Sequence, residues 1–98
     1  MEERKEKVMI VEDDPISMEF VLCSLKELGF IKVYKAQDGS DALSVLGWAG
    51  VDLVISDWNM PKMGGLELYK NIKRDPKLKN IPFMLMTSSS EKEKVIEV

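Results

Sequence analysis

Histidine is absent from the 98 residues of this chain, and cysteine occurs once, as Cys23. The absence of histidine excludes imidazole as a general base, a phosphate carrier or a metal ligand, so a metal site would have to rest on oxygen ligands. A single cysteine cannot form a disulfide within the chain, and a reduced thiol of this kind is typical of a cytosolic protein.

Long hydrophobic runs are also missing. The mixed-charge start MEERKEK leads into the short apolar run VMIV, which is too brief for a signal sequence or a membrane span, so we expect a cytoplasmic protein. The net charge of -3 gives no reason to expect direct binding to nucleic acid or to a membrane. Hydrophobic residues at 45% and charged residues at 32% fit one small globular domain over residues 1–98.

Short apolar segments typical of buried strands alternate with segments of helical period. Strands are predicted at 7–11, 32–36, 52–56 and 81–86. Helices are predicted from Pro15 onward with Asp14 as the cap, after Asp38-Gly39, after Gly64-Gly65 and from 91 to 98. Regular alternation of strand and helix predicts an α/β fold, a doubly wound parallel sheet with helices on both faces.

Polar residues gather where three of the predicted strands end. Glu12 and Asp13 follow the first strand, Asp57 follows the third, and Thr87 with Ser88 follows the fourth. Ligands of such sheets bind at the carboxyl ends of the strands. Three acidic side chains converging there would repel one another unless a hard divalent cation lay among them, and Mg²⁺ is the natural candidate.

Each of these features also has a plainer interpretation. Asp14 is expected to cap the helix that begins at Pro15 rather than to bind a metal. Asp57 taken alone could be a solvated loop carboxylate, and Ser89 or Ser90 could cap the last predicted helix. Trp58 is expected to be a packing residue beside the site. The joint pattern of Glu12, Asp13 and Asp57 nevertheless favours a site over these readings.

Four stretches carry a resemblance to a known family: VEDD at 11–14, LKELGF at 25–30, VISDWNMPKMGGLEL at 54–68 and MLMTS at 84–88. In these stretches the chain resembles the CheY-like receiver domains of two-component response regulators. The resemblance implies a flavodoxin-like sheet of strand order 2-1-3-4. It implies a signalling protein that catalyses its own phosphorylation and dephosphorylation rather than a metabolic enzyme, and it favours a role in chemotaxis.

The resemblance also implies roles for individual residues. Asp57 matches the aspartate that accepts a phosphoryl group from a histidine kinase. Asp13 and Asp57 match direct ligands of Mg²⁺, Glu12 acts on the ion largely through water, and Asn59 offers its backbone carbonyl. The hydroxyl of Thr87 and the backbone N–H of Ser88 match groups that bind the phosphoryl group. A downstream signalling protein is the implied second partner.

The chain departs from the family pattern at its end. Receivers are built from five strand–helix units, and we expect this chain to stop inside the fourth helix. It would then lack the fifth strand and the lysine at its end, so we expect a poorer phosphoacceptor. The fourth strand, IPFMLM, would become an exposed sheet edge. We therefore expect a homodimer, formed through that edge or by exchange of a segment.

Three functions of different classes remain open at this point. The first is the phosphorylated signalling receiver, and the second is an interaction module that binds its partners without phosphorylation. The third, a phosphatase with an aspartate nucleophile, is disfavoured. That class carries its nucleophile after the first strand with a second Asp two residues later, whereas here Asp57 follows the third strand and Asn59 stands two residues on.

Overall fold

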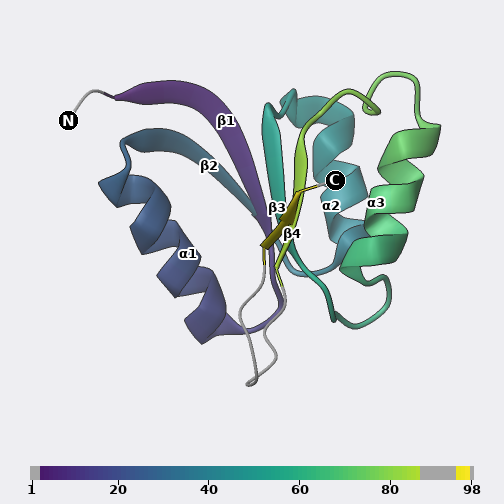
Figure 1. Ribbon diagram of the computed structural model, residues 1–98, viewed down its shortest axis with the longest axis horizontal. Helices are drawn as coiled ribbons and strands as arrows, with labels where there is room; N and C mark the ends of the chain where they lie inside the picture. The colour runs from purple at the N-terminus through teal and green to yellow at the C-terminus, as the bar shows by residue number, and fades with distance from the viewer. Residues whose placement is uncertain (1–2, 87–94, 98) are drawn as a thin grey trace.

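A computed structural model describes residues 3–86 and 95–97 of the chain (Figure 1). Its elements, in chain order, are β1 (Arg4–Val11), α1 (Pro15–Glu27), β2 (Phe30–Ala36), α2 (Gly39–Ala49), β3 (Leu53–Asp57), α3 (Gly65–Arg74), β4 (Phe83–Met86) and β5 (Val95–Glu97). Within these described ranges, no helix combines the length and the apolar character that a bilayer crossing requires.

The strands form one sheet in the order β2-β1-β3-β4-β5. The first four strands are parallel. Val8 of β1 lies opposite Val33 of β2 on one side and Leu53 of β3 on the other, and Asp57 of β3 lies opposite Met86 of β4. This confirms the α/β prediction and the strand order 2-1-3-4. Because β1 and β3 lie in the middle of the sheet, their apolar residues are covered on both faces.

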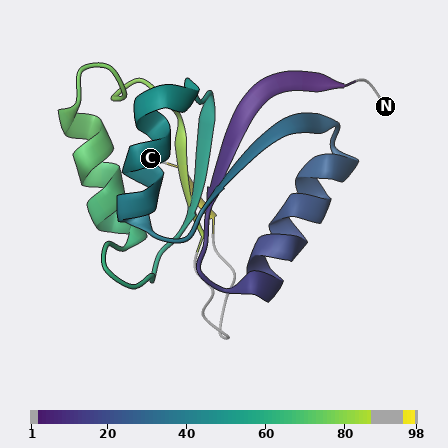
Figure 2. The same cartoon turned by 180° about the vertical axis from the view of Figure 1, so that it is seen from behind.

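Helices cover the two faces of the sheet unequally. The ribbon viewed from either side has α1 on one face and both α2 and α3 on the other (Figures 1 and 2). The larger core lies under α2 and α3 and includes Met9, Val54, Leu68 and Phe83. The smaller core lies under α1, and its buried residues are Val8, Ile10, Leu25 and Ile55. The α1 face is therefore the less protected one.

Local capping signals set the helix boundaries. Asp14 caps α1 by accepting the backbone N–H of Ser17 at 2.9 Å, and Pro15 occupies the first helical position, where it costs no hydrogen bond. Asp38 caps α2 in the same way, by accepting the N–H of Asp41 at 2.8 Å. Gly29 follows α1 with φ 98°, a left-handed conformation that glycine adopts without strain.

The predicted helix at 91–98 is wrong for residues 95–97, which form β5; residues 91–94 and 98 lie outside the described part. β5 runs antiparallel to β4, with Leu85 opposite Ile96. The outer edge of β4 offers backbone groups that need partners, and the β-branched Val95 and Ile96 suit a strand. The expectation that β4 is an open sheet edge is wrong for the same reason, because β5 pairs with it.

Candidate functional site

Two adjacent parallel strands bring the acidic residues together. Val11, the last residue of β1, lies opposite Ser56 of β3, so Glu12 and Asp57 extend from the same edge of the sheet. Oxygen atoms of Glu12, Asp13 and Asp57 all lie within 4.8 Å of one another, and we name these three residues the acidic cluster. The predicted convergence of these three carboxylates is therefore present in the fold.

The acidic cluster is partly removed from water. Glu12 and Asp57 are each only 4% exposed, whereas Asp13 is exposed. Burial raises the pKa of Glu12 from 4.5 to about 7, with further increases from the charges of Asp57 and Asp13. The backbone N–H of Asp14 donates to Glu12 Oε2 at 3.0 Å and opposes this shift. Negative charge is therefore unfavourable within the acidic cluster, and a bound cation would offset that cost.

Asp57 is held by its surroundings. The backbone N–H of Trp58 donates to Asp57 Oδ1 at 2.8 Å. The Trp58 N–H also donates to the Met86 carbonyl of β4, and the Gly65 N–H at the start of α3 donates to the Trp58 carbonyl, each at 2.9 Å. These bonds limit the positions that the Asp57 carboxylate can adopt.

Gly65 allows α3 to begin directly against the end of β3. A Cβ atom at this position would collide with the Asp57 carbonyl oxygen and would lie 2.7 Å from Leu85 Cδ2. No side chain larger than hydrogen fits there without displacing one of these neighbours. The paired glycines noted in the sequence therefore serve a close approach between the helix and the strand that carries Asp57.

The remaining predicted residues are placed as follows. Asn59 lies exposed in the loop between β3 and α3, two residues beyond Asp57. Trp58 is half-buried and packs against the larger core, as the packing interpretation predicted. Asp14 caps α1, and the hydrogen bonds from Ser17 lower its pKa. Thr87 and Ser88 lie outside the described residues.

Comparison with known proteins decides the family. The family model described as the response regulator receiver domain matches residues 8–98. The chain belongs to this family. The receiver domain is 40% identical over 91 residues to the chemotaxis protein CheY-3 of Vibrio cholerae, covering 93% of this chain and 70% of that protein. It is 33% identical to the chemotaxis protein CheY of Pseudomonas aeruginosa, covering 93% of this chain and 73% of the relative.

Solved structures give the same result. CheY4 of Vibrio cholerae superimposes on this receiver domain with a TM-score of 0.80 and 32% identity, over 89% of this chain and 72% of that one. The signal receiver domain of a histidine kinase from Syntrophus aciditrophicus gives a TM-score of 0.81 and 35% identity, over 87% and 64%. The acidic cluster therefore belongs to a receiver domain of the two-component class, the family in which phosphoryl acceptance is general.

Two features of the receiver domain were not apparent in the sequence. One is the burial of Glu12 and its raised pKa, since VEDD reads as a polar turn after a strand. The other is a polar hollow of about 410 Å³ at the start of α2, lined by Asp38, Asp41 and Lys62 among others. Lys62 has φ 67°, a conformation uncommon for lysine that no sequence signal indicated.

Proposed function

We propose that Asp57 accepts a phosphoryl group from the phosphohistidine of a histidine kinase, with Mg²⁺ bound at the acidic cluster. The observation that supports this function is the convergence of three carboxylates within 4.8 Å at the sheet edge. In the transfer, an oxygen of Asp57 forms the new P–O bond while the P–N bond to the kinase histidine breaks. Such a reaction needs alignment and charge neutralisation more than covalent assistance from the protein.

The donor set fits Mg²⁺. Carboxylate and carbonyl oxygens are the ligands this ion prefers, and it usually retains several waters. Asp13 and Asp57 are the proposed direct ligands, the Asn59 carbonyl is a third, and Glu12 acts through water. When bound, the ion would supply positive charge for the oxygens of the transferred group. The receiver domain's own part is to hold Asp57, through the Trp58 N–H, in a fixed orientation.

Two further groups belong to the proposal. The Thr87 hydroxyl and the Ser88 N–H are the proposed donors to the phosphoryl oxygens.

The 98-residue polypeptide, used as it stands, is proposed to react more slowly than a relative with a lysine beside the phosphoryl group. Loss of one charge-assisted hydrogen bond of that kind costs about 1.5–3 kcal/mol.

A phosphorylation assay tests this function. The chain is incubated with acetyl phosphate and Mg²⁺, and the mass gain of one phosphoryl group is followed by intact-protein mass spectrometry. We expect phosphorylation of the unmodified chain, none of Asp57→Asn, and none when EDTA removes the metal. A Glu67→Gln variant, altered at an exposed site in α3, serves as the matched control and is expected to react normally.

Failure of the assay would favour the alternative function. If neither acetyl phosphate nor a kinase phosphorylates the chain, the receiver domain is an interaction module that binds partners without phosphorylation. If Asp57→Asn is modified as readily as the unmodified chain, the reaction occurs elsewhere and the assignment of Asp57 is wrong.

The setting of this reaction is proposed to be the cytoplasm. Cys23 is a free, exposed thiol, which suits a reducing compartment. Because similar proteins are named as chemotaxis proteins, we infer that the downstream partner is a protein of motility control. Phosphorylation of Asp57 would regulate the binding of that partner.

A homodimer completes the proposal. Since β5 occupies the edge of β4, the dimer surface we propose is the α1 face, on which Leu53, Met84 and Met86 are only half-buried. The proposed surface also includes the outer side of α1, where Ile16 and Phe20 are 80% and 72% exposed. A second copy related by two-fold symmetry brings equivalent apolar side chains against each other, which an isologous interface requires.

A further inference from the structure

Cationic side chains are concentrated at the end of α3 and in the loop that follows it. We name five exposed residues the basic patch: Lys70, Lys73, Arg74, Lys77 and Lys79. The single carboxylate between residues 70 and 79, that of Asp75, accepts the backbone N–H of Lys77 at 2.8 Å. The basic patch is therefore locally positive, although the whole chain has a net charge of -3.

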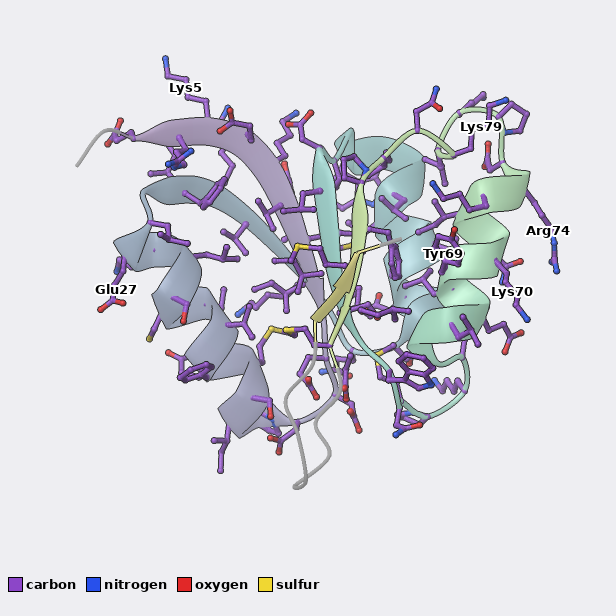
Figure 3. The ribbon with its side chains drawn as sticks, in the orientation of Figure 1. Lys5, Glu27, Tyr69, Lys70, Arg74 and Lys79 are labelled. Carbon is purple, nitrogen blue, oxygen red and sulfur yellow. The ribbon has the colours of Figure 1, made fainter. Side chains whose placement is uncertain are left out.

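The basic patch is remote from the acidic cluster. α3 begins at Gly65, beside Asp57, and at 1.5 Å per residue Lys70 lies about 7.5 Å and Arg74 about 13.5 Å further along the helix axis. Lys70 and Arg74 extend from the outer side of α3, and Lys79 lies beyond the end of the helix (Figure 3). A ligand of this surface would leave the phosphorylation site open.

Several side chains of the basic patch are held in place. Lys73 Nζ donates to the Lys79 carbonyl at 2.9 Å and lies 5.5 Å from the centre of the Tyr69 ring. Arg74 Nη1 lies 3.5 Å from Asn71 Oδ1. Among residues 3–86 and 95–97, no salt bridge to a carboxylate engages these cations. They are thus partly ordered and still available to an external anion, which lowers the entropic cost of binding.

Stabilisation of the fold explains only part of the basic patch. Lys73 and Arg74 lie in the last turn of α3, where positive charge is favourable to the helix dipole. Lys70 lies before that turn, and Lys77 and Lys79 lie after it. For these three cations the helix provides no such explanation.

We propose that the basic patch binds an acidic segment of a partner protein. Electrostatic interactions between exposed charges are screened beyond about 8–10 Å at physiological salt, so a short segment responds to the local positive charge. Duplex DNA or an anionic membrane extends beyond the basic patch, so it would also be repelled by the net negative charge of the chain. Lys70 and Arg74 are four residues apart on one helix face, a spacing that suits two carboxylates of one peptide.

A peptide-binding experiment tests this proposal. The probe is a fluorescein-labelled oligoglutamate peptide, and binding is measured by fluorescence anisotropy at about 0.1 M salt, where charges more than about 10 Å apart are screened. We expect Lys70→Glu combined with Arg74→Glu to weaken binding about tenfold or more. The control combines Lys32→Glu with Lys35→Glu, two exposed positions on β2, and changes the net charge equally. We expect about twofold weakening or less in the control, and circular dichroism checks that both variants are folded.

Three results would overturn the proposal. One is equal loss of binding in both double variants, which would show that net charge, rather than the basic patch, attracts the peptide. Another is tighter binding to duplex DNA or to vesicles of anionic phospholipid than to the peptide. The third is a set of peptide-induced NMR shifts that does not include residues 70–79. Asp57→Asn is expected to bind the peptide normally, so this test is independent of phosphorylation.

Discussion

The ionisation of Glu12 depends on the fold. Its side chain is buried beside Asp57, and its pKa is raised to about 7. An unfolded chain exposes the same carboxyl to water, where its pKa is near 4.5. The folded state therefore holds a proton on Glu12 over a pH range in which the unfolded chain has lost it.

This difference predicts how the stability of the metal-free chain depends on pH. Because the folded pKa is raised, the contribution of Glu12 is fully present below pH 4.5 and is lost as pH rises to about 7. We expect Glu12→Gln to remove this part of the dependence. Urea unfolding in EDTA, at about pH 5 and about pH 8, measures the free energy of unfolding of the unmodified chain and of Glu12→Gln. Parallel pH profiles would show that Glu12 does not carry the effect.

Gly65 provides the second prediction at this scale. Gly65→Ala is expected to lower the free energy of unfolding by about 1–3 kcal/mol, because the new Cβ meets the Asp57 carbonyl and Leu85. Gly47→Ala is the matched control. A Cβ at Gly47, inside α2, has nothing within 4 Å, so this change is expected to stabilise the chain by about 0.4–1 kcal/mol. Chemical denaturation that ranks the two variants in the opposite order would contradict the close approach at Gly65.

At the scale of elements, side chains at the boundaries define where helices begin. Asp38 is 8% exposed and accepts the Asp41 N–H at the start of α2. Asp38→Ala is expected to cost about 0.5–2 kcal/mol of stability, and Asp38→Asn, which keeps an acceptor oxygen, markedly less. Thermal unfolding by circular dichroism compares them. Equal losses would mean that the negative charge, not the capping bond, matters.

The sequence predicted those elements whose signals are local. Asp14-Pro15, Asp38-Gly39 and Gly64-Gly65 marked the three described helices, because caps and glycine conformations depend on a few neighbouring residues. Residues 95–97 were predicted as helix because their strand conformation depends on pairing with β4, a contact between separate segments. The acidic cluster was predicted from topology, but the burial that shifts the pKa of Glu12 depends on packing that the sequence does not display.

At the scale of the whole molecule, the two faces of the sheet differ in cover. In the described part of the chain, α2 and α3 pack on one face and α1 on the other, and Ile16 and Phe20 remain exposed on α1. Because β5 pairs with the edge of β4, the homodimer that we propose uses the apolar α1 face instead.

The proposed homodimer makes a prediction at this scale. Phe20→Ser is expected to shift the chain towards monomer, because it removes apolar surface from the outer side of α1, which is part of the proposed interface. Trp48→Ser serves as control, since Trp48 is 69% exposed on α2, away from that face. Light scattering over a range of concentrations gives the molar mass of each protein. A monomeric unmodified chain at high concentration would contradict the proposed dimer, and so would equal effects of the two substitutions.

Calorimetric titration with Mg²⁺ tests most directly whether Glu12, Asp13 and Asp57 form one Mg²⁺ site. We expect a single site in the unmodified chain, with tryptophan emission changing in parallel because Trp58 adjoins Asp57. Asp13→Asn is expected to weaken binding about tenfold or more, whereas Glu19→Gln, an exposed change on α1, leaves it unchanged. Equal affinity in the unmodified chain and Asp13→Asn, or no Mg²⁺ binding at all, would show that these three residues do not form a Mg²⁺ site.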